Sequence, residues 1–178
     1  LIRAVPPDQI PAIERSGVAR VTATKILRVV YLQLDGDGRA GKTPLTDVRV
    51  RRAINHAVNV DEIMGKVLGG KAVRSPNGNN PMVFGYDPTT KPYAFDPAQA
   101  KKLLAEAGYP QGLELTLNTY TGSIVNVEQV AQAIQGYLSQ AGVRTKVRHF
   151  TDVGQYLANF RGSKLDGMTL ASWGYNSV

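Results

Sequence analysis

The spacing of apolar residues predicts several helices along the chain. In the clearest stretch, 96–107, apolar residues recur every three or four positions, as on one face of a helix. Asp96 and Pro97 are typical of a helix start, and Gly108 of a helix end. The same spacing predicts further helices at 46–58, from 59 to about 68, at 126–141 and at 153–160.

Polar residues at the start of two of these segments predict how the helices are capped. Asn59 with Glu62, and Asn126 with the glutamine three positions later, have the spacing of a capping box. A short helix is also expected within 5–17, where Asp8 is a plausible N-cap. The remaining stretch at 71–95 holds several Pro, Gly and Asn residues and no periodicity, which predicts a long extended connection.

Runs rich in β-branched and aromatic residues, or alternating apolar and polar residues, predict the strands. The expected strands are 18–24, 27–34, 113–119, 143–149 and 167–173. In the second half of the chain, strands and helices alternate, a pattern that packs as a sheet with right-handed crossovers and helices over its faces. The sequence therefore predicts an α/β fold, a mixed sheet flanked by helices. Ligands of such sheets lie at the carboxyl ends of the strands.

Composition narrows the possible functions only slightly. The chain has 178 residues, no cysteine and a formal net charge of +7. Without cysteine it has no disulfides and no thiolate metal site. A basic surface attracts nucleic acid or anionic surfaces, so an isolated basic domain that binds them is the alternative function. Nucleic-acid platforms also supply aromatic residues on the basic face for stacking. In the basic strand at 143–149 the alternating residues are Val143, Thr145 and Val147, which favours a solvated strand face.

Catalytic and metal-binding patterns are absent from the sequence. There is no nucleophile elbow, phosphate-binding loop or dinucleotide fingerprint. His56 and His149 have no partners at metal-ligand spacing, so we interpret them as partly exposed structural residues. The loop at Asp35 superficially resembles a calcium loop, but Thr46 stands where the closing acid should be. We therefore expect no enzyme activity, no metal and no cofactor.

Two candidate binding segments follow the ends of predicted strands. One begins at Tyr120 and Thr121, and the other runs from Trp173 through Gly174 and Tyr175 to Asn176. Trp173, the only tryptophan in the chain, provides either a flat wall for a ligand or a plug at the edge of the core.

Four blocks of sequence resemble bacterial extracellular solute-binding protein family 5. The first is PLTDVRVRRAINHAVNVDEI at 44–63. The second joins GYDP at 85–88 to FDP at 95–97 and AKKLLAEAGYP at 100–110. The third runs from AQAIQ at 131–135 to Gly142, and the fourth is Trp173-Gly174. The order and spacing of the four blocks match this family over nearly the whole chain.

The resemblance implies a periplasmic-binding-protein-like lobe from a component of an ABC importer. The family includes dipeptide-, oligopeptide- and nickel-binding proteins, whose two lobes close on a small solute outside the cytoplasmic membrane. By this resemblance, residues 1–178 form a single C-terminal lobe, and the N-terminal lobe and the tail are missing. The implied partners are a peptide-like solute and the permease subunits, with no nucleic acid. The implied location is periplasmic or extracellular, associated with the membrane through the transporter.

The resemblance also assigns roles at the ligand site. In peptide-binding relatives the Trp of the fourth block lines the pocket, a role that Trp173 fits. Three residues later those relatives have an Asp that holds the α-amino group of the peptide, whereas this chain has Asn176. A neutral amide forms a hydrogen bond but no charge pair with an ammonium group. By the same analogy, Tyr120, Thr121 and the strand residue Arg28 face the cleft.

Overall fold

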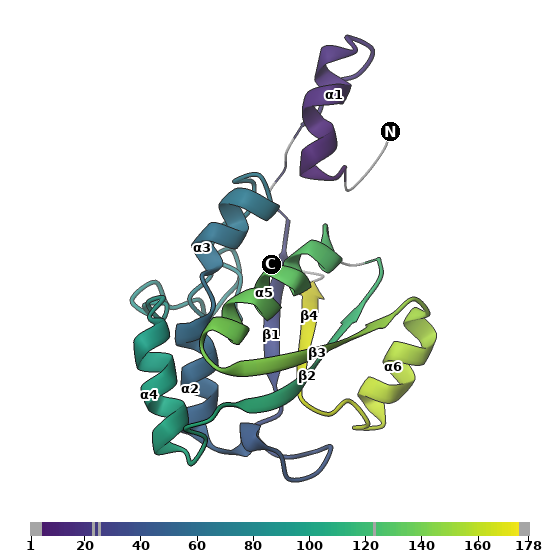
Figure 1. Cartoon of the computed structure of the whole chain (residues 1–178). Coiled ribbons are helices and arrows are strands. Elements are labelled where there is room, and N and C mark those ends of the chain that lie inside the picture. The colour runs from purple at the N-terminus through teal and green to yellow at the C-terminus, as the bar shows by residue number, and fades with distance from the viewer. Residues whose placement is uncertain (1–4, 23, 25, 123, 175–178) are drawn as a thin grey trace.

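The computed structural model describes residues 5–22, 24, 26–122 and 124–174. Its centre is a four-stranded mixed sheet with the strand order β1-β4-β2-β3 (Figure 1). The strands are β1 (Arg28–Leu34), β2 (Leu113–Tyr120), β3 (Val143–Phe150) and β4 (Met168–Gly174). β2 runs parallel to both β3 and β4, whereas β1 is antiparallel to β4. This arrangement confirms the predicted α/β fold with a mixed sheet.

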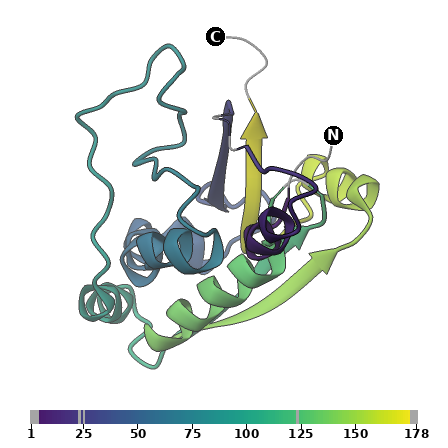
Figure 2. The same cartoon turned by 90° about the horizontal axis from the view of Figure 1, so that it is seen from above.

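Helices cover the two faces of the sheet unequally (Figure 2). The main core lies between one face and α2 (Val48–Ala57), α4 (Pro97–Glu106) and α5 (Val127–Gln140). Leu117 of β2, Leu138 of α5 and Met168 of β4 are fully buried in it. A smaller cluster lies under α6 (Val153–Arg161) on the opposite face. Tyr120 belongs to this second cluster because it is an odd number of residues from Leu117 in the same strand.

Local capping explains why α2, α3 and α4 begin where they do. The side chain of Asp96 accepts a hydrogen bond from the Gln99 amide at the start of α4, and Asp47 caps α2 in the same way. Asn59 accepts from the Glu62 amide, as the capping-box spacing predicts. The helix that follows is one turn of α-helix, α3 (Val60–Glu62), continued as a π-turn, η3 (Ile63–Val67).

Three expectations about local structure were wrong. Asp8 does not cap the first helix: a 3₁₀ turn, η1 (Pro7–Gln9), follows Pro6 without a side-chain cap and leads into α1 (Ile10–Arg15). Residues 18–22 and 24 form no strand. Asn126 is left-handed, with φ 51°, and makes no capping bond within α5; instead its side-chain amide donates to the Val67 carbonyl at 3.1 Å.

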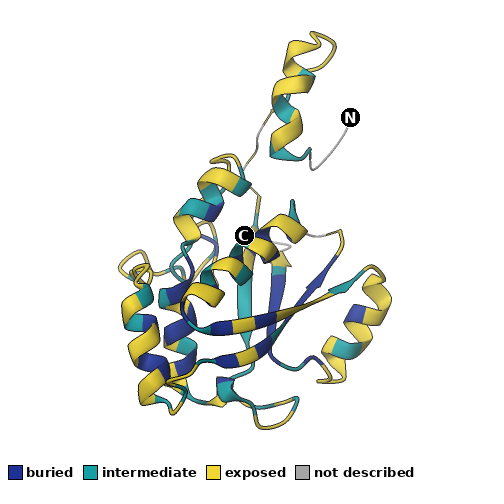
Figure 3. Cartoon of the chain, viewed as in Figure 1, coloured by how far each residue is buried: buried dark blue, intermediate teal, exposed yellow. Residues whose placement is uncertain are grey.

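Two segments outside this core, α1 and the connection at 71–95, are mostly exposed (Figure 3). η1 and α1 contain no buried residue, and α1 projects from the end of the molecule where β1 begins. The connection at 71–95 has no helix or strand. The remaining short element is a 3₁₀ turn, η2 (Pro44–Thr46), which buries Leu45 against α2. No helix among the described residues has the length and apolar character needed to span a bilayer.

Candidate functional site

The carboxyl end of β4 lies beside the start of β1 and forms the centre of the candidate site (Figure 1). Gly174 pairs with Arg28, and Trp173 pairs with Val29. The two strands are antiparallel, so a residue that closes β4 is placed beside one that opens β1. The sheet thus brings together Trp173, Gly174 and Arg28, which were selected separately from the sequence. Tyr175 and Asn176 lie outside the described residues.

Trp173 is presented to solvent rather than used as a plug for the core. It is 60% exposed, and Gly174 and Arg28 are also exposed. Alternation along β4 and β1 places Trp173 and Val29 on the face away from the main core, which Leu170 and Met168 occupy. An exposed indole at the edge of a sheet provides a flat apolar surface with one hydrogen-bond donor. Trp173 therefore does not plug the core, and its role as a ligand wall stays a prediction.

Tyr120, the last residue of β2, is almost completely buried. It is 9% exposed, and its ring stacks on Tyr156 of α6 with a centroid separation of 4.0 Å and an interplanar angle of 16°. Burial, with smaller contributions from Tyr120 and Tyr31, raises the pKa of Tyr156 to about 12. The Tyr120 hydroxyl lies 3.5 Å from Ser172 Oγ, next to Trp173 in β4. Tyr120 therefore connects the end of β4 to α6, through its contacts with Ser172 and Tyr156.

Thr121 is exposed and is held in place by a histidine. His149 Nε2 lies 2.9 Å from Thr121 Oγ1, and His149 Nδ1 lies 2.7 Å from Thr119 Oγ1. Glu128 of α5 approaches Nε2 at 3.9 Å. The imidazole therefore connects β2, β3 and α5 at the carboxyl edge. The sequence interpretation of His149 as a partly exposed structural residue agrees with this arrangement, but its neighbours were not predicted, since they are about 30 residues away along the chain.

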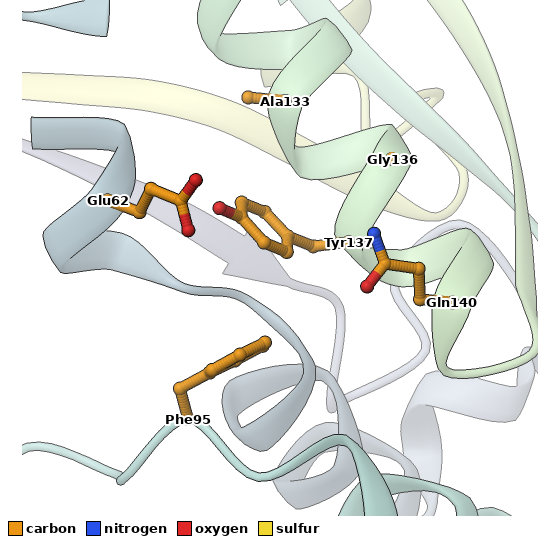
Figure 4. A pocket seen from close by; sticks show the side chains of 6 residues that line it. All are labelled: Glu62, Phe95, Ala133, Gly136, Tyr137 and Gln140. Atoms are coloured by element: carbon orange, nitrogen blue, oxygen red, sulfur yellow. The ribbon is translucent and has the colours of Figure 1, made fainter. Parts of the chain in front are cut away.

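One hollow lies between α3, α5 and the segment before α4 (Figure 4). It is lined by Glu62, Phe95, Ala133, Gly136, Tyr137 and Gln140. Hydrogen bonds from Lys66 and Tyr137 lower the pKa of Glu62, and burial together with the Glu62 bond raises the pKa of Tyr137 to about 12. Phe95 meets Tyr137 edge to face at 5.6 Å. These contacts join α3, α5 and the start of α4, which gives the hollow a structural explanation.

No cluster of three or more metal-ligating side chains occurs among the residues that the structure describes. In the loop at Asp35, the carboxylate binds backbone amides of the same loop. The Asp35 carboxylate accepts hydrogen bonds from the Arg39 and Ala40 amides at 3.0 and 3.1 Å. Although burial acts in the opposite direction, these backbone bonds hold the pKa of Asp35 below its ordinary value. The carboxylate closes its own turn.

A family model described as "Bacterial extracellular solute-binding proteins, family 5 Middle" matches residues 1–178. The chain belongs to this family. Its family is therefore one of binding proteins rather than enzymes, and the nucleic-acid alternative finds no support among the relatives.

Individual relatives agree with the family assignment. The chain is 35% identical to the dipeptide-binding protein of Escherichia coli strain K12 over 122 residues, 65% of this chain and 22% of that protein. It is 29% identical to the glutathione-binding protein GsiB of Pectobacterium atrosepticum over 176 residues, 97% of this chain and 33% of that protein.

A solved structure agrees with the fold. The periplasmic binding protein DppA of Helicobacter pylori, in complex with the peptide STSA, superposes with a TM-score of 0.83 at 28% identity. The superposition covers 96% of this chain and 32% of DppA. The chain thus spans a third or less of the length of the relatives that it matches. The predicted periplasmic-binding-protein-like lobe is confirmed.

Proposed function

We propose that this chain is the C-terminal lobe of a solute-binding protein that captures peptide-like small solutes and delivers them to an ABC permease. The family match over all 178 residues carries this proposal. The proposal places the protein outside the cytoplasmic membrane and in contact with that membrane only through the transporter. The N-terminal lobe and a C-terminal tail would account for the additional length of the relatives.

In this proposal the solute lies against the carboxyl edge of β4. Trp173 forms an apolar wall, and Gly174 allows the backbone to approach because a side-chain carbon at that position would meet only the Leu27 carbonyl, 4.0 Å away. Arg28 supplies positive charge suited to a carboxylate of the solute. Thr121, fixed by His149, adds a hydroxyl group, and Tyr120 supports the edge. By the family resemblance, Tyr175 and Asn176, which follow β4 in the sequence, also contact the solute.

The residue types that follow β4 in the sequence favour a solute whose amino group need not be charged. Asn176 offers an amide oxygen and an amide NH₂, which bind neutral donors and acceptors alike. A carboxylate at the same position would instead select an ammonium group through charge pairing. Amine-blocked peptides, glycosides and opines are therefore solutes that this edge accepts alongside free peptides.

The experiment is titration calorimetry on the full-length protein with matched pairs of solutes. Free dipeptides, the same dipeptides acetylated at the amine, and glutathione would be titrated at neutral pH. We expect at least one solute to bind at micromolar Kd, and blocking the amine to change the affinity by less than about tenfold, since no ion pair is lost. Failure of every peptide-like solute, together with tight binding of an oligonucleotide that weakens steeply with salt, would overturn the proposal.

A further inference from the structure

The long connection at 71–95 carries an apolar tip that the lobe leaves uncovered. Phe84 is fully exposed, at 104% of its reference area, and Met82 is 40% exposed. We refer to Met82, Val83 and Phe84 as the apolar loop tip. Exposing a whole phenylalanine ring to water forfeits the stabilisation that its burial would bring, and exposed apolar patches mark contact sites.

The apolar loop tip is held in place by hydrogen bonds at its base. Asn80 is buried, and its side-chain amide donates to the Ile26 carbonyl at 3.1 Å. The oxygen of the same side chain accepts from the Met82 amide at 3.0 Å, and the Val83 amide donates to the Asn80 carbonyl at 3.0 Å. Asn80 thus fastens the turn below the tip to another part of the chain. A fixed apolar group costs less entropy to bury than a loose one.

The anchor places the loop on the same side of the lobe as the candidate solute site. Ile26 lies two residues before Arg28, which pairs with Gly174 beside Trp173. Ile26 is itself 64% exposed. In Figure 2 the connection extends on the side of the lobe toward which β4 points. The exposed Ile26 and the anchor of the connection at Asn80 therefore lie close to the edge where the solute is proposed to bind.

The chemistry of the tip points to a protein surface as its partner. No residue from Ser75 to Tyr86 is charged, in a chain whose net charge is +7. An uncharged apolar tip has no electrostatic attraction to phosphates or anionic headgroups, and it matches the depletion of charge at the cores of protein interfaces. In the relatives, two thirds or more of the polypeptide lies outside the part that this chain matches, so the same polypeptide has additional protein that could contact the tip.

We infer that the apolar loop tip is a contact surface for the remainder of the same polypeptide, where Phe84 is buried beside the solute site. The inference rests on the proposed two-lobed protein but does not require that a particular solute bind. The connection at 71–95 would then link this lobe to the rest of the protein through direct packing contacts.

The test is thiol accessibility in the full-length protein. A Phe84→Cys variant and a Lys102→Cys control, whose position is exposed on α4, would be treated with a maleimide and mapped by peptide mass. The present chain has no cysteine that would compete for the reagent. We expect the Phe84→Cys thiol to react about tenfold or more slowly than the control in the native protein, and at the same rate in denaturant. Hydroxyl-radical oxidation of Phe84 in the wild-type protein provides the same readout without a mutation.

Each outcome is decisive for the inference. Protection of Phe84→Cys in the native full-length protein supports it, whether or not solute is present. Equal labelling of both thiols, or protection that appears only when lipid vesicles or the permease are added, would overturn it. Protection in a protein that binds no peptide-like solute would leave the inference standing and refute the proposed function, so the two can fail separately.

Discussion

Replacing Trp173 by alanine in the full-length protein should weaken solute binding without unfolding the lobe. A buried tryptophan covers up to about 250 Å². Trp173 is 60% exposed, so roughly 150 Å² of its surface is available for contact with a solute. At about 25 cal/mol per Å², covering half of that area contributes about 2 kcal/mol, or about a 30-fold change in Kd.

Calorimetry with the best solute from the panel would measure this change, and circular dichroism during chemical denaturation would check the fold. Trp173→Phe keeps a flat ring and should lose less affinity than Trp173→Ala. Phe95→Ala removes an exposed aromatic ring from the helical side of the lobe and should leave the affinity unchanged. If Trp173→Ala binds within about twofold of the wild type while melting normally, Trp173 does not contact the solute, and the proposed site is wrong.

Three further predictions concern stability. Asp96→Ala removes the cap of α4 and should lower the free energy of unfolding by about 1 kcal/mol in denaturant titrations, whereas Asp96→Asn should restore most of it. Gly167→Ala should destabilise the protein by on the order of 1–3 kcal/mol, because φ is +79° and the added carbon would lie 2.4 Å from the Thr116 carbonyl oxygen; an unchanged denaturation midpoint would refute this. The hydrogen bonds from Arg49 lower the pKa of Asp47 to about 2, so its stabilising effect is present above about pH 4 and is lost as the pH falls toward 2. When acid denaturation curves are compared, the Asp47→Asn variant should lack the loss of stability that protonation of Asp47 causes in the wild type. Identical curves for the two proteins would contradict this prediction.

The helix boundaries set by short-range contacts were predictable from the sequence. Asp96 and Asn59 cap their helices through amides three residues away. These contacts depend on the neighbouring residues and not on the rest of the fold. Asn126 has the same spacing, but tertiary structure overrode the local preference: its side chain reaches the Val67 carbonyl, and its backbone is left-handed. A capping motif thus predicts a cap only where no distant group competes for its side chain.

Strand pairing depended on partners that sequence patterns do not identify. Residues 18–24 have strand-forming composition, yet 18–22 and 24 form no strand, because a strand needs a neighbour to satisfy its amides. Within the segment 27–34, β1 forms hydrogen bonds with β4, which satisfies its amides. The strand ends in the second half of the chain were therefore predictable. In the first half, the sequence did not show which of the two strand-like segments would pair with β4 at the edge of the sheet.

The sequence by itself determined the family, the α/β class, most helix boundaries and the two strand ends that carry the candidate site. These follow from periodicity, capping and motifs, which are local properties of the chain. Only the tertiary structure decided that Arg28 lies beside Gly174, that Trp173 is exposed while Tyr120 is buried against Tyr156, and that Phe84 stands uncovered on an anchored loop. Each of these depends on contacts between residues far apart in sequence, which packing of the whole lobe selects.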